Sequence, residues 1–458
     1  MNRSRIRHPP TSMRRILLAL LLLLSCNLAV AFQSNAPTTH RTTTTTKSAD
    51  TKQMQMYVDI QESALRDIGT MDEWATSCGV QRCEGFQLTP TKEQPVLEVG
   101  VVTATDLPNG SPVLFVPNAM CLSSRESLQE IGRIEAAEKR LVSAKAAEHV
   151  PQFYLFLKIL IEFEKGDQSP WFPWFNALPR YYANGSSMTP FCFDCLPPLA
   201  SSLAMGERIK FIQFFQALRY VDFLSDNVKT SKDLAKWAFA ALYTRGFPTP
   251  DGDFKIAPMA DMFDHSADPE VSLQYDEEGN CVVYSCKDVP AGSPLRLSYG
   301  DSTNPTQLFA RYGFLDESSE ASFCKIMISQ PSKQLVDMGY AQNRMLFYKN
   351  TGEISQEVWD VLLYQILTSD PNVQDQFYQA HMNGDYQTKQ AIHDHYFAQT
   401  SVALNNHVNT FLKDLDNLQK KGVGKDVNEH PRLPLIMQHN EFVKQTFLAV
   451  QAQLAQYS

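Results

Sequence analysis

Alternation of apolar and polar residues predicts strands in the early part of the chain, followed by helices. Between residues 96 and 116, two β-rich stretches flank Asp106–Gly110, whose Asn-Gly step favours a tight turn. We therefore expect a β-hairpin there. Apolar residues three and four apart then predict a helix. Its buried face is expected to hold Phe153, Phe156, Leu157, Leu160 and Ile161.

The helical pattern continues beyond that element. The aromatic cluster at residues 171–175 is interpreted as core, since aromatic clusters are usually packed in interiors. A further helix is expected at about 206–224. Another is expected to begin at the N-cap candidate Ser231.

Strand patterns return after residue 270. Val271–Tyr275 and Cys281–Ser285 are expected strands joined by a turn, and Leu295–Tyr299 is a third. Asn304 followed by proline is a good helix N-cap, predicting a short helix that ends at Tyr312. From about residue 335 to the end, helical patterns dominate.

Composition and charge narrow the class of protein. The chain has 458 residues, 43% hydrophobic and 20% charged, which is typical of a globular protein and excludes a largely disordered one. Residues 1–49 hold seven cations and no acid, leaving 34 cations and 50 acids, a net charge of −16, in the remainder. A body this acidic is poorly suited to a phosphate backbone, so nucleic acid is not an expected partner.

Cysteine spacing argues against a structural metal site. Nine cysteines are scattered along the chain, and Cys192 and Cys195 form a single C-x-x-C without a second one. Asp261, Asp264 and His265 lie within five residues, but adjacent side chains diverge in a strand and no third ligand has suitable spacing. We expect no metal, and mostly free thiols in a reducing compartment.

The first 31 residues have the pattern of a secretory signal peptide. Two arginines precede the nine-residue apolar run Ile16–Leu24, and a small-x-small cleavage pattern follows at residues 29–31. A bilayer needs about 20 apolar residues, so no stable membrane anchor is expected after processing. An uncleaved N-terminal anchor is the alternative.

Residues 32–54 have the composition of a transit peptide, being rich in hydroxyl groups and free of acids before Asp50. With Phe32 just after the cleavage site, the leader resembles the bipartite plastid-targeting leaders of algae with secondary plastids. We expect import into the plastid stroma. The alternative is a disordered linker on a protein of the secretory pathway.

Three short segments carry the candidate chemistry. They are Tyr243–Phe247, Ile256–Ser266, and the stretch from Leu295 to Phe314. Taken alone, each also has a structural explanation, such as a hydrogen-bonded histidine beside a turn or an aromatic residue at the end of a strand. Their order and spacing along the chain make them informative together.

In this order, the segments resemble the SET-domain protein methyltransferases, and within them the Rubisco large-subunit lysine methyltransferase subgroup, which includes a histidine-methylating branch. That family has an Asp-x-x-Asn-His stretch at its S-adenosylmethionine site, a Tyr-Gly strand end and a following Asn…Tyr-Gly-Phe helix. The matching stretches here are Asp261–His265, Ser298–Gly300 and Asn304–Phe314. The resemblance covers about residues 70–440.

The resemblance implies an α+β fold. Residues 55–320 are expected to form a SET domain with a helical insertion at about 125–235, and residues 321–458 an all-α substrate-binding domain. The implied activity is S-adenosyl-L-methionine-dependent N-methylation of a protein lysine. The implied partner is a protein, with the Rubisco large subunit and a plastid aldolase as possibilities.

The resemblance also assigns roles to residues. Tyr299 is the expected catalytic residue. Cofactor binding is expected from Glu98, Val99, Gly100, Arg245, Asp261, Asp264, His265 and Tyr299. Substrate binding is expected from Arg245, Asp261, Tyr312 and Phe314.

Two departures from the family pattern leave other functions open. Asp264 stands where the family usually has Asn, and an ionised carboxylate accepts hydrogen bonds but cannot donate them. The turn before the first strand also has only one glycine, Gly100. A catalytically inactive SET-fold binding module and a histidine-directed methyltransferase are therefore kept as alternatives.

Overall fold

The computed structural model describes residues 55–92, 98–301 and 303–457. The predicted signal peptide and transit-peptide-like segment lie outside these residues, so both stay predictions. Within the described ranges, no helix is both long enough and apolar enough to cross a membrane.

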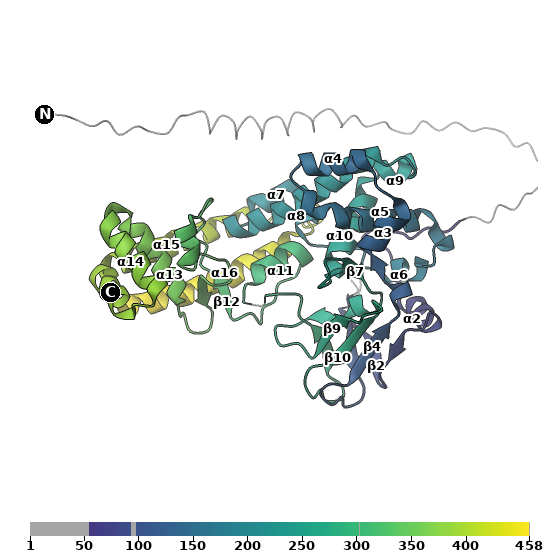
Figure 1. The fold of residues 1–458 in the computed structure, drawn as a ribbon, viewed down its shortest axis with the longest axis horizontal. Coiled ribbons are helices and arrows are strands. Elements are labelled where there is room, and N and C mark those ends of the chain that lie inside the picture. Colours follow the sequence, from purple (N-terminus) through teal and green to yellow (C-terminus); the bar gives the residue numbers. More distant parts are fainter. Residues whose placement is uncertain (1–54, 93–97, 302, 458) are drawn as a thin grey trace, which may run out of the picture. The chain divides into compact units, whose positions relative to one another are not determined.

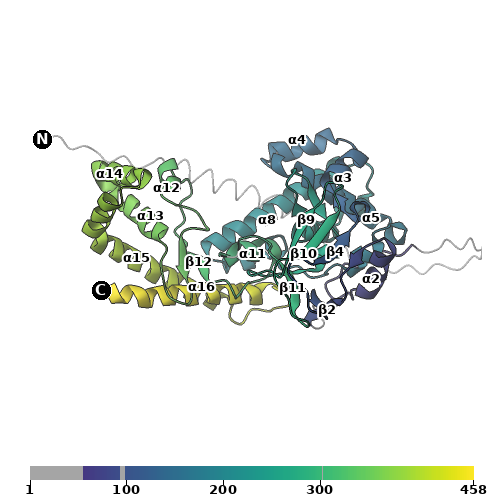
Figure 2. The same cartoon turned by 60° about the horizontal axis from the view of Figure 1, so that its bottom comes forward.

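Short strands of the described chain form three small sheets before residue 300 (Figures 1 and 2). The first has the order β1 (Gln81–Arg82), β4 (Pro112–Val116), β10 (Cys281–Ser285), β9 (Val271–Tyr275). The second has the order β2 (Phe86–Lys92), β3 (Glu98–Thr103), β11 (Pro294–Leu297), β8 (Asp264–His265). The third has the order β5 (Leu122–Ser123), β7 (Phe254–Ile256), β6 (Phe247–Pro248).

Helices occupy most of the chain between β5 and β6, and from residue 55 onward one helix precedes β1. They are α2 (Ile68–Ser77), α3 (Ser124–Ile131), α4 (Glu135–Ser143), α5 (Val150–Glu164), α6 (Phe172–Ala177), α7 (Pro190–Asp194), α8 (Pro198–Ala217), α9 (Asp226–Thr230) and α10 (Lys232–Arg245). After β11 comes α11 (Pro305–Tyr312). Single 3-10 turns are η2 (Asn118–Met120), η3 (Ala147–His149), η4 (Gly166–Gln168), η5 (Gly185–Ser187), η6 (Leu218–Tyr220), η7 (Ala260–Met262), η8 (Leu367–Ser369) and η9 (Ala455–Tyr457).

The hairpin predicted between residues 96 and 116 is wrong. β3 pairs with β2 and β11, whereas β4 pairs with β1 and β10, so the two strands belong to different sheets. The expected turn does form, with Gly110 at a φ of 81°, but it carries the chain from one sheet to the other. Both strands are central, and local alternation shows that a strand is buried without identifying its neighbours.

Other local predictions are confirmed. β9 and β10 form the expected antiparallel pair, with Cys281 opposite Tyr275. The side chains of Ser231 and Asn304 cap α10 and α11 by accepting hydrogen bonds from first-turn amides.

Two helices differ from the prediction. α5 is buried more completely than predicted, since every residue from 153 to 160 is buried rather than one face alone. α8 begins and ends before the predicted 206–224.

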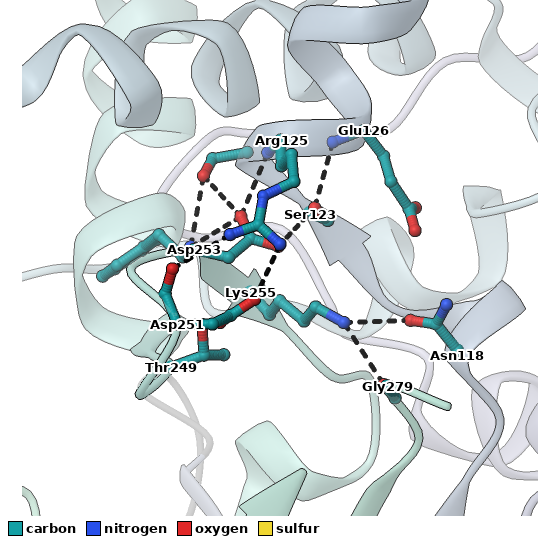
Figure 3. Close-up of polar contacts among 11 residues, drawn as sticks. Asn118, Ser123, Arg125, Glu126, Thr249, Asp251, Asp253, Lys255 and Gly279 are labelled. Atoms are coloured by element: carbon teal, nitrogen blue, oxygen red, sulfur yellow. Dashed lines mark hydrogen bonds and ion pairs between the residues drawn. The ribbon is translucent and has the colours of Figure 1, made fainter. Parts of the chain in front are cut away.

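Hydrogen bonds of the Asp253 carboxylate join the start of α3 to β7 (Figure 3). Its carboxylate accepts hydrogen bonds from the hydroxyls of Ser123 (2.6 Å) and Ser124 (2.7 Å). It also accepts from the backbone N–H groups of Arg125 (3.0 Å) and Phe254 (2.7 Å). Burial raises the pKa of Asp253, but these donors outweigh it and hold that pKa below its ordinary value. The network joins the start of α3 to β7.

The C-terminal region is helical apart from one two-stranded sheet, which the sequence pattern did not indicate because its strands have only three residues each. The elements are β12 (Ala321–Phe323), α12 (Lys333–Asp337), β13 (Leu346–Tyr348), α13 (Gln356–Ile366), α14 (Pro371–Asn383), α15 (Tyr386–Gly422) and α16 (Leu433–Leu454). Most of their buried apolar residues form one hydrophobic cluster, which also includes Leu199 of α8. The domain boundaries expected from the sequence stay predictions.

α16 lies beside α11 (Figures 1 and 2), and buried polar groups join them. The Lys325 Nζ donates to the Thr306 Oγ1 of α11 at 3.0 Å, and that hydroxyl lies 3.1 Å from the His439 Nε2 of α16. The ring of Phe309 stacks on His439 with centroids 4.5 Å apart. Burial lowers the pKa of Lys325 to about 7. The helix that ends at Tyr312 is thus tied to the C-terminal region.

Candidate active site

The predicted site residues surround a cavity of about 430 Å³. Its walls come from residues 62–66, 98–99, 179–183, 244–245, 261–265, 299 and 312–315. The predicted residues on these walls are Glu98, Val99, Arg245, Asp261, Asp264, His265, Tyr299, Tyr312 and Phe314. Segments far apart in the sequence therefore meet at one place.

Gly100 is the predicted residue that does not line the cavity. It lies behind the wall, where a Cβ would be 2.5 Å from the Asp264 Oδ2 and 3.0 Å from the Thr91 Cγ2. A larger residue at position 100 would therefore displace the Asp264 carboxylate. Gly100 leaves room for that carboxylate at the cavity wall.

Arg245 and Asp261 form a buried ion pair in the cavity. Arg245 is the last residue of α10, and its Nη1 donates to the backbone oxygen of Asp261 at 2.6 Å and lies 3.4 Å from the Oδ2. The Trp174 Nε1 donates to the same Oδ2 at 3.0 Å, while the Oδ1 has no hydrogen-bond partner among the described residues. Burial lowers the pKa of Arg245, but Asp261 outweighs it and the net pKa is raised. Arg245 therefore stays cationic.

Tyr299 and His265 are brought together by a parallel strand pair. β8 and β11 place Leu297 opposite His265, so Tyr299 follows just beyond the strand end. The backbone N–H of Tyr299 donates to the His265 Nδ1 at 3.1 Å. Burial lowers the pKa of His265, which keeps the imidazole neutral near pH 7.

The hydroxyl of Tyr299 points toward the 261–265 segment. It donates a hydrogen bond to the backbone oxygen of Phe263. Burial and the nearby Asp264 carboxylate raise the pKa of Tyr299 well above its ordinary value. The phenol is therefore protonated throughout the physiological range, and it acts as a hydrogen-bonding group rather than a base.

Three aromatic rings stand together at this end of the cavity. The rings of Tyr299 and Tyr312 have centroids 4.9 Å apart, and Phe314 lies 6.2 Å and 6.1 Å from them. Gly313 has a φ of 83° and ends α11, and a Cβ there would lie 2.5 Å from the backbone N of Asn184. Glycine at this position lets the chain turn sharply, so Tyr312 and Phe314 both line the cavity.

The structure adds residues that sequence reasoning missed. Glu62, Arg66 and Tyr182 line the cavity, although the segments that hold them gave no motif. The Arg66 Nε donates to the backbone oxygen of Ala177 at 2.7 Å. Burial lowers the pKa of Arg66 to about 9, and the neighbouring Arg245 adds to this shift. The only available signal was a lone arginine in an aperiodic stretch, which is too weak to interpret.

In the comparison with protein families, a SET domain model matches residues 98–300. The search of curated proteins gives no match. Among solved structures, the SET domain of LSMT bound to lysine and AdoHcy has a TM-score of 0.57 and 15% identity, covering 85% of this chain and 91% of that chain. Rubisco LSMT bound to AdoMet has a TM-score of 0.55 and 15% identity, covering 85% and 92%.

A third structure, Rubisco LSMT bound to sinefungin and monomethyllysine, has a TM-score of 0.57 and 15% identity, covering 85% of this chain and 92% of that chain. At this identity, the likeness concerns the fold. The α+β architecture expected from the sequence is thereby confirmed. Residues 98–300 of this chain match the SET domain model, and the chain has the fold of the Rubisco LSMT structures.

Proposed function

We propose that this protein is an S-adenosylmethionine-dependent protein-lysine N-methyltransferase. The observation that carries the proposal is the position of Tyr299, whose hydroxyl bonds to the 261–265 segment while its ring stands beside Tyr312 and Phe314. One cavity thus joins a polar, charged end to an aromatic end. The LSMT structures of the same fold carry AdoMet, AdoHcy or sinefungin, and two of the three carry lysine or monomethyllysine.

The charged end suits the cofactor. The buried Asp261 Oδ1 has no partner among the described residues and can accept a hydrogen bond from an ammonium or hydroxyl group. Arg66 supplies a buried cation for a carboxylate. The residues that would hold S-adenosylmethionine are Glu98, Val99, Arg245, Asp261, Asp264 and His265, with Gly100 acting through the room it leaves. When bound, the cofactor supplies a methyl group carried on a sulfonium.

The aromatic end suits an alkyl amine. A lysine must be neutral to act as a nucleophile, yet its ordinary pKa is near ~10.4. The rings of Tyr299, Tyr312 and Phe314 form an apolar part of the cavity wall, and such surroundings disfavour the charged ammonium and lower that pKa. The Tyr299 hydroxyl, held by Phe263, orients the amine, and alignment of the two reactants supplies much of the rate enhancement.

We propose a plastid protein as substrate, on the composition of the 54-residue leader alone. The Rubisco large subunit and a sugar-phosphate aldolase are the candidates. Fusion of residues 1–55 to a fluorescent reporter tests the location: a plastid signal is expected, and export would contradict it.

The proposed activity is tested in two steps. Calorimetry with S-adenosylmethionine should show saturable binding to the chain after residue 54. Incubation with radiolabelled cofactor and stromal extract should then label one or a few proteins, and mass spectrometry should place the methyl group on lysine. Absence of cofactor binding contradicts the proposal. Binding without transfer to purified Rubisco, aldolase or extract favours the inactive binding module, and methyl-histidine favours the histidine-directed alternative.

A further inference from the structure

We propose that Arg432, at the start of α16, is a positioning residue for the cofactor-binding cavity. The inference rests on the proposed function and deepens it, because it assigns part of the site to the C-terminal region. Arg432 does not line the cavity, and it acts through three residues that do: Glu62, Tyr181 and Tyr182.

Arg432 contacts all three residues at once. Its Nε donates to the backbone oxygen of Tyr182 at 2.9 Å, and its Nη2 pairs with the Glu62 carboxylate. The guanidinium also lies over the ring of Tyr181, 4.4 Å from the centroid. The Tyr181 hydroxyl in turn donates to the backbone oxygen of Pro431 at 2.9 Å. Among cationic side chains, only the planar guanidinium group of arginine has several N–H donors placed to make this set of contacts.

This part of the wall separates two cavities. The second, of about 500 Å³, is lined by Arg432 together with Glu62 and Tyr182. Side chains between two cavities have fewer packing neighbours than groups in the hydrophobic core. Their positions therefore depend on directed polar contacts, and Arg432 supplies these from behind.

Glu62 also belongs to a segment that needs an anchor. Residues 55–67 have no helix or strand, and they provide the cavity wall at Glu62, Ala64 and Arg66. Backbone hydrogen bonds of Met56 and Asp67 hold the two ends of this segment. The buried Val58 and the hydrogen bonds of Leu65 and Arg66 also hold the segment, and the ion pair of Glu62 anchors the stretch between them.

Arg432 itself is well fixed. It is 8% exposed and is the N-terminal cap residue of α16. The next turn packs Leu433 and Ile436 into a cluster with Phe309 and Ala310 of α11, the helix that ends at the cavity. The backbone of Arg432 thus leads directly into a turn that packs against α11, the helix that ends at Tyr312.

The test uses the chain after residue 54, which contains the whole described fold. We expect Arg432→Ala to weaken S-adenosylmethionine binding by about tenfold or more, because two hydrogen bonds to a charged group are lost. The KM for the cofactor should rise, while kcat at saturating cofactor changes little. Arg432→Lys should rescue part of the affinity, since it keeps the charge without the fork. Arg344→Ala, which removes an exposed ion pair with Glu357 in the same region, should bind as wild type does.

Hydrogen exchange without cofactor supplies a second readout, independent of the proposed function. Amides in residues 57–66 and 181–183 should exchange faster in Arg432→Ala than in wild type or Arg344→Ala, with β9 and β10 unchanged. Unchanged exchange there overturns the inference whatever the binding result, as does unchanged affinity in a protein whose wild type binds. If wild type does not bind the cofactor, the proposed function fails and exchange alone decides the positioning role. If Arg432→Ala does not fold, cofactor affinity and hydrogen exchange are measured instead in Arg432→Lys and Glu62→Gln.

Discussion

The His265 Nδ1 accepts a hydrogen bond from the backbone N–H of Tyr299, 3.1 Å away. A backbone amide can only donate, so Nδ1 is unprotonated and the neutral ring carries its proton on Nε2. That nitrogen lies 3.5 Å from the Asp316 Oδ2. The contact between two walls of the cavity therefore exists only while the imidazole is neutral.

We expect cofactor binding and turnover to fall as the pH drops through the lowered pKa of His265, which lies below the ordinary histidine value of about 6.5. Burial lowers the pKa of His265 in the folded state, so the unfolded state takes up the proton first. The neutral His265 side chain therefore makes its full contribution to the free energy of unfolding above about pH 6.5. That contribution is lost as the pH falls through the lowered pKa of the folded state. Affinity measured from pH 8 to 5 checks this. His265→Asn, whose amide oxygen can accept the same bond, should shift or abolish the acid limb, and an identical limb would contradict the assignment.

Tyr299→Phe should lower the methyl-transfer rate on the order of 100-fold, a typical cost of removing one positioned hydrogen-bonding group from an active site. The phenyl ring keeps its contacts with Tyr312 and Phe314, so the melting temperature should change little. Transfer of radiolabelled methyl groups and thermal unfolding measure the two effects. Tyr378→Phe removes a hydroxyl that binds Asp337 in the C-terminal region, and it should leave the rate unchanged. Full activity of Tyr299→Phe would remove Tyr299 from the catalytic role.

Asp253→Asn should destabilise the fold by about 3 kcal/mol, since an amide cannot satisfy the four donors that surround the carboxylate. Denaturant unfolding near pH 7 measures the change. Asp251→Asn is the matched control, because that neighbouring carboxylate is exposed and its loss should have little effect. Equal stability of the two variants would show that the Asp253 network is unimportant.

Gly313→Ala should reduce both stability and activity. Gly313 and Gly110 share a φ near +80°, where a Cβ costs about 1–2 kcal/mol. Only at Gly313 would the Cβ also meet backbone, at 2.5 Å from the Asn184 N. Gly110→Ala is thus a control for strain alone. We expect it to retain activity, whereas Gly313→Ala displaces Tyr312 and Phe314 and loses it. Similar activity in both variants would contradict the packing argument.

Lys325→Met should stabilise the protein by about 1–4 kcal/mol, because it removes a buried amine while keeping the alkyl chain. Burial lowers the pKa of Lys325 from 10.5 to about 7. Between these values the unfolded state holds the proton and the folded state does not, so wild-type stability rises with pH there. The advantage of Lys325→Met should therefore be largest below pH 7 and shrink toward pH 10. A constant advantage would mean that Lys325 stays protonated in the fold.

The sequence anticipated the parts of the fold that depend on local order. The caps at Ser231 and Asn304 and the β9–β10 pair follow from neighbouring residues, and all three are confirmed. The partners of β3 and β4 do not, because any buried strand satisfies the same alternation. The hairpin prediction failed for that reason.

In the candidate site, too, the sequence reveals the residues of local motifs but not those that only tertiary packing brings to the cavity. Residues in contiguous motifs, such as Asp261 and His265, were found because their spacing is local. Arg66 and Tyr182 reach the cavity only through tertiary packing, and Arg432 contributes from a helix more than a hundred residues after Tyr299. Single arginines in unpatterned sequence carry no signal until the fold brings them together.

The contacts of Arg432 limit how this protein can be re-engineered. Grafting the last helices of a relative onto residues 55–320 would remove the hydrogen bond that Arg432 donates to the backbone oxygen of Tyr182. A working chimera would need to carry Glu62 and Arg432 as a pair, because each is the other's counter-ion across the junction.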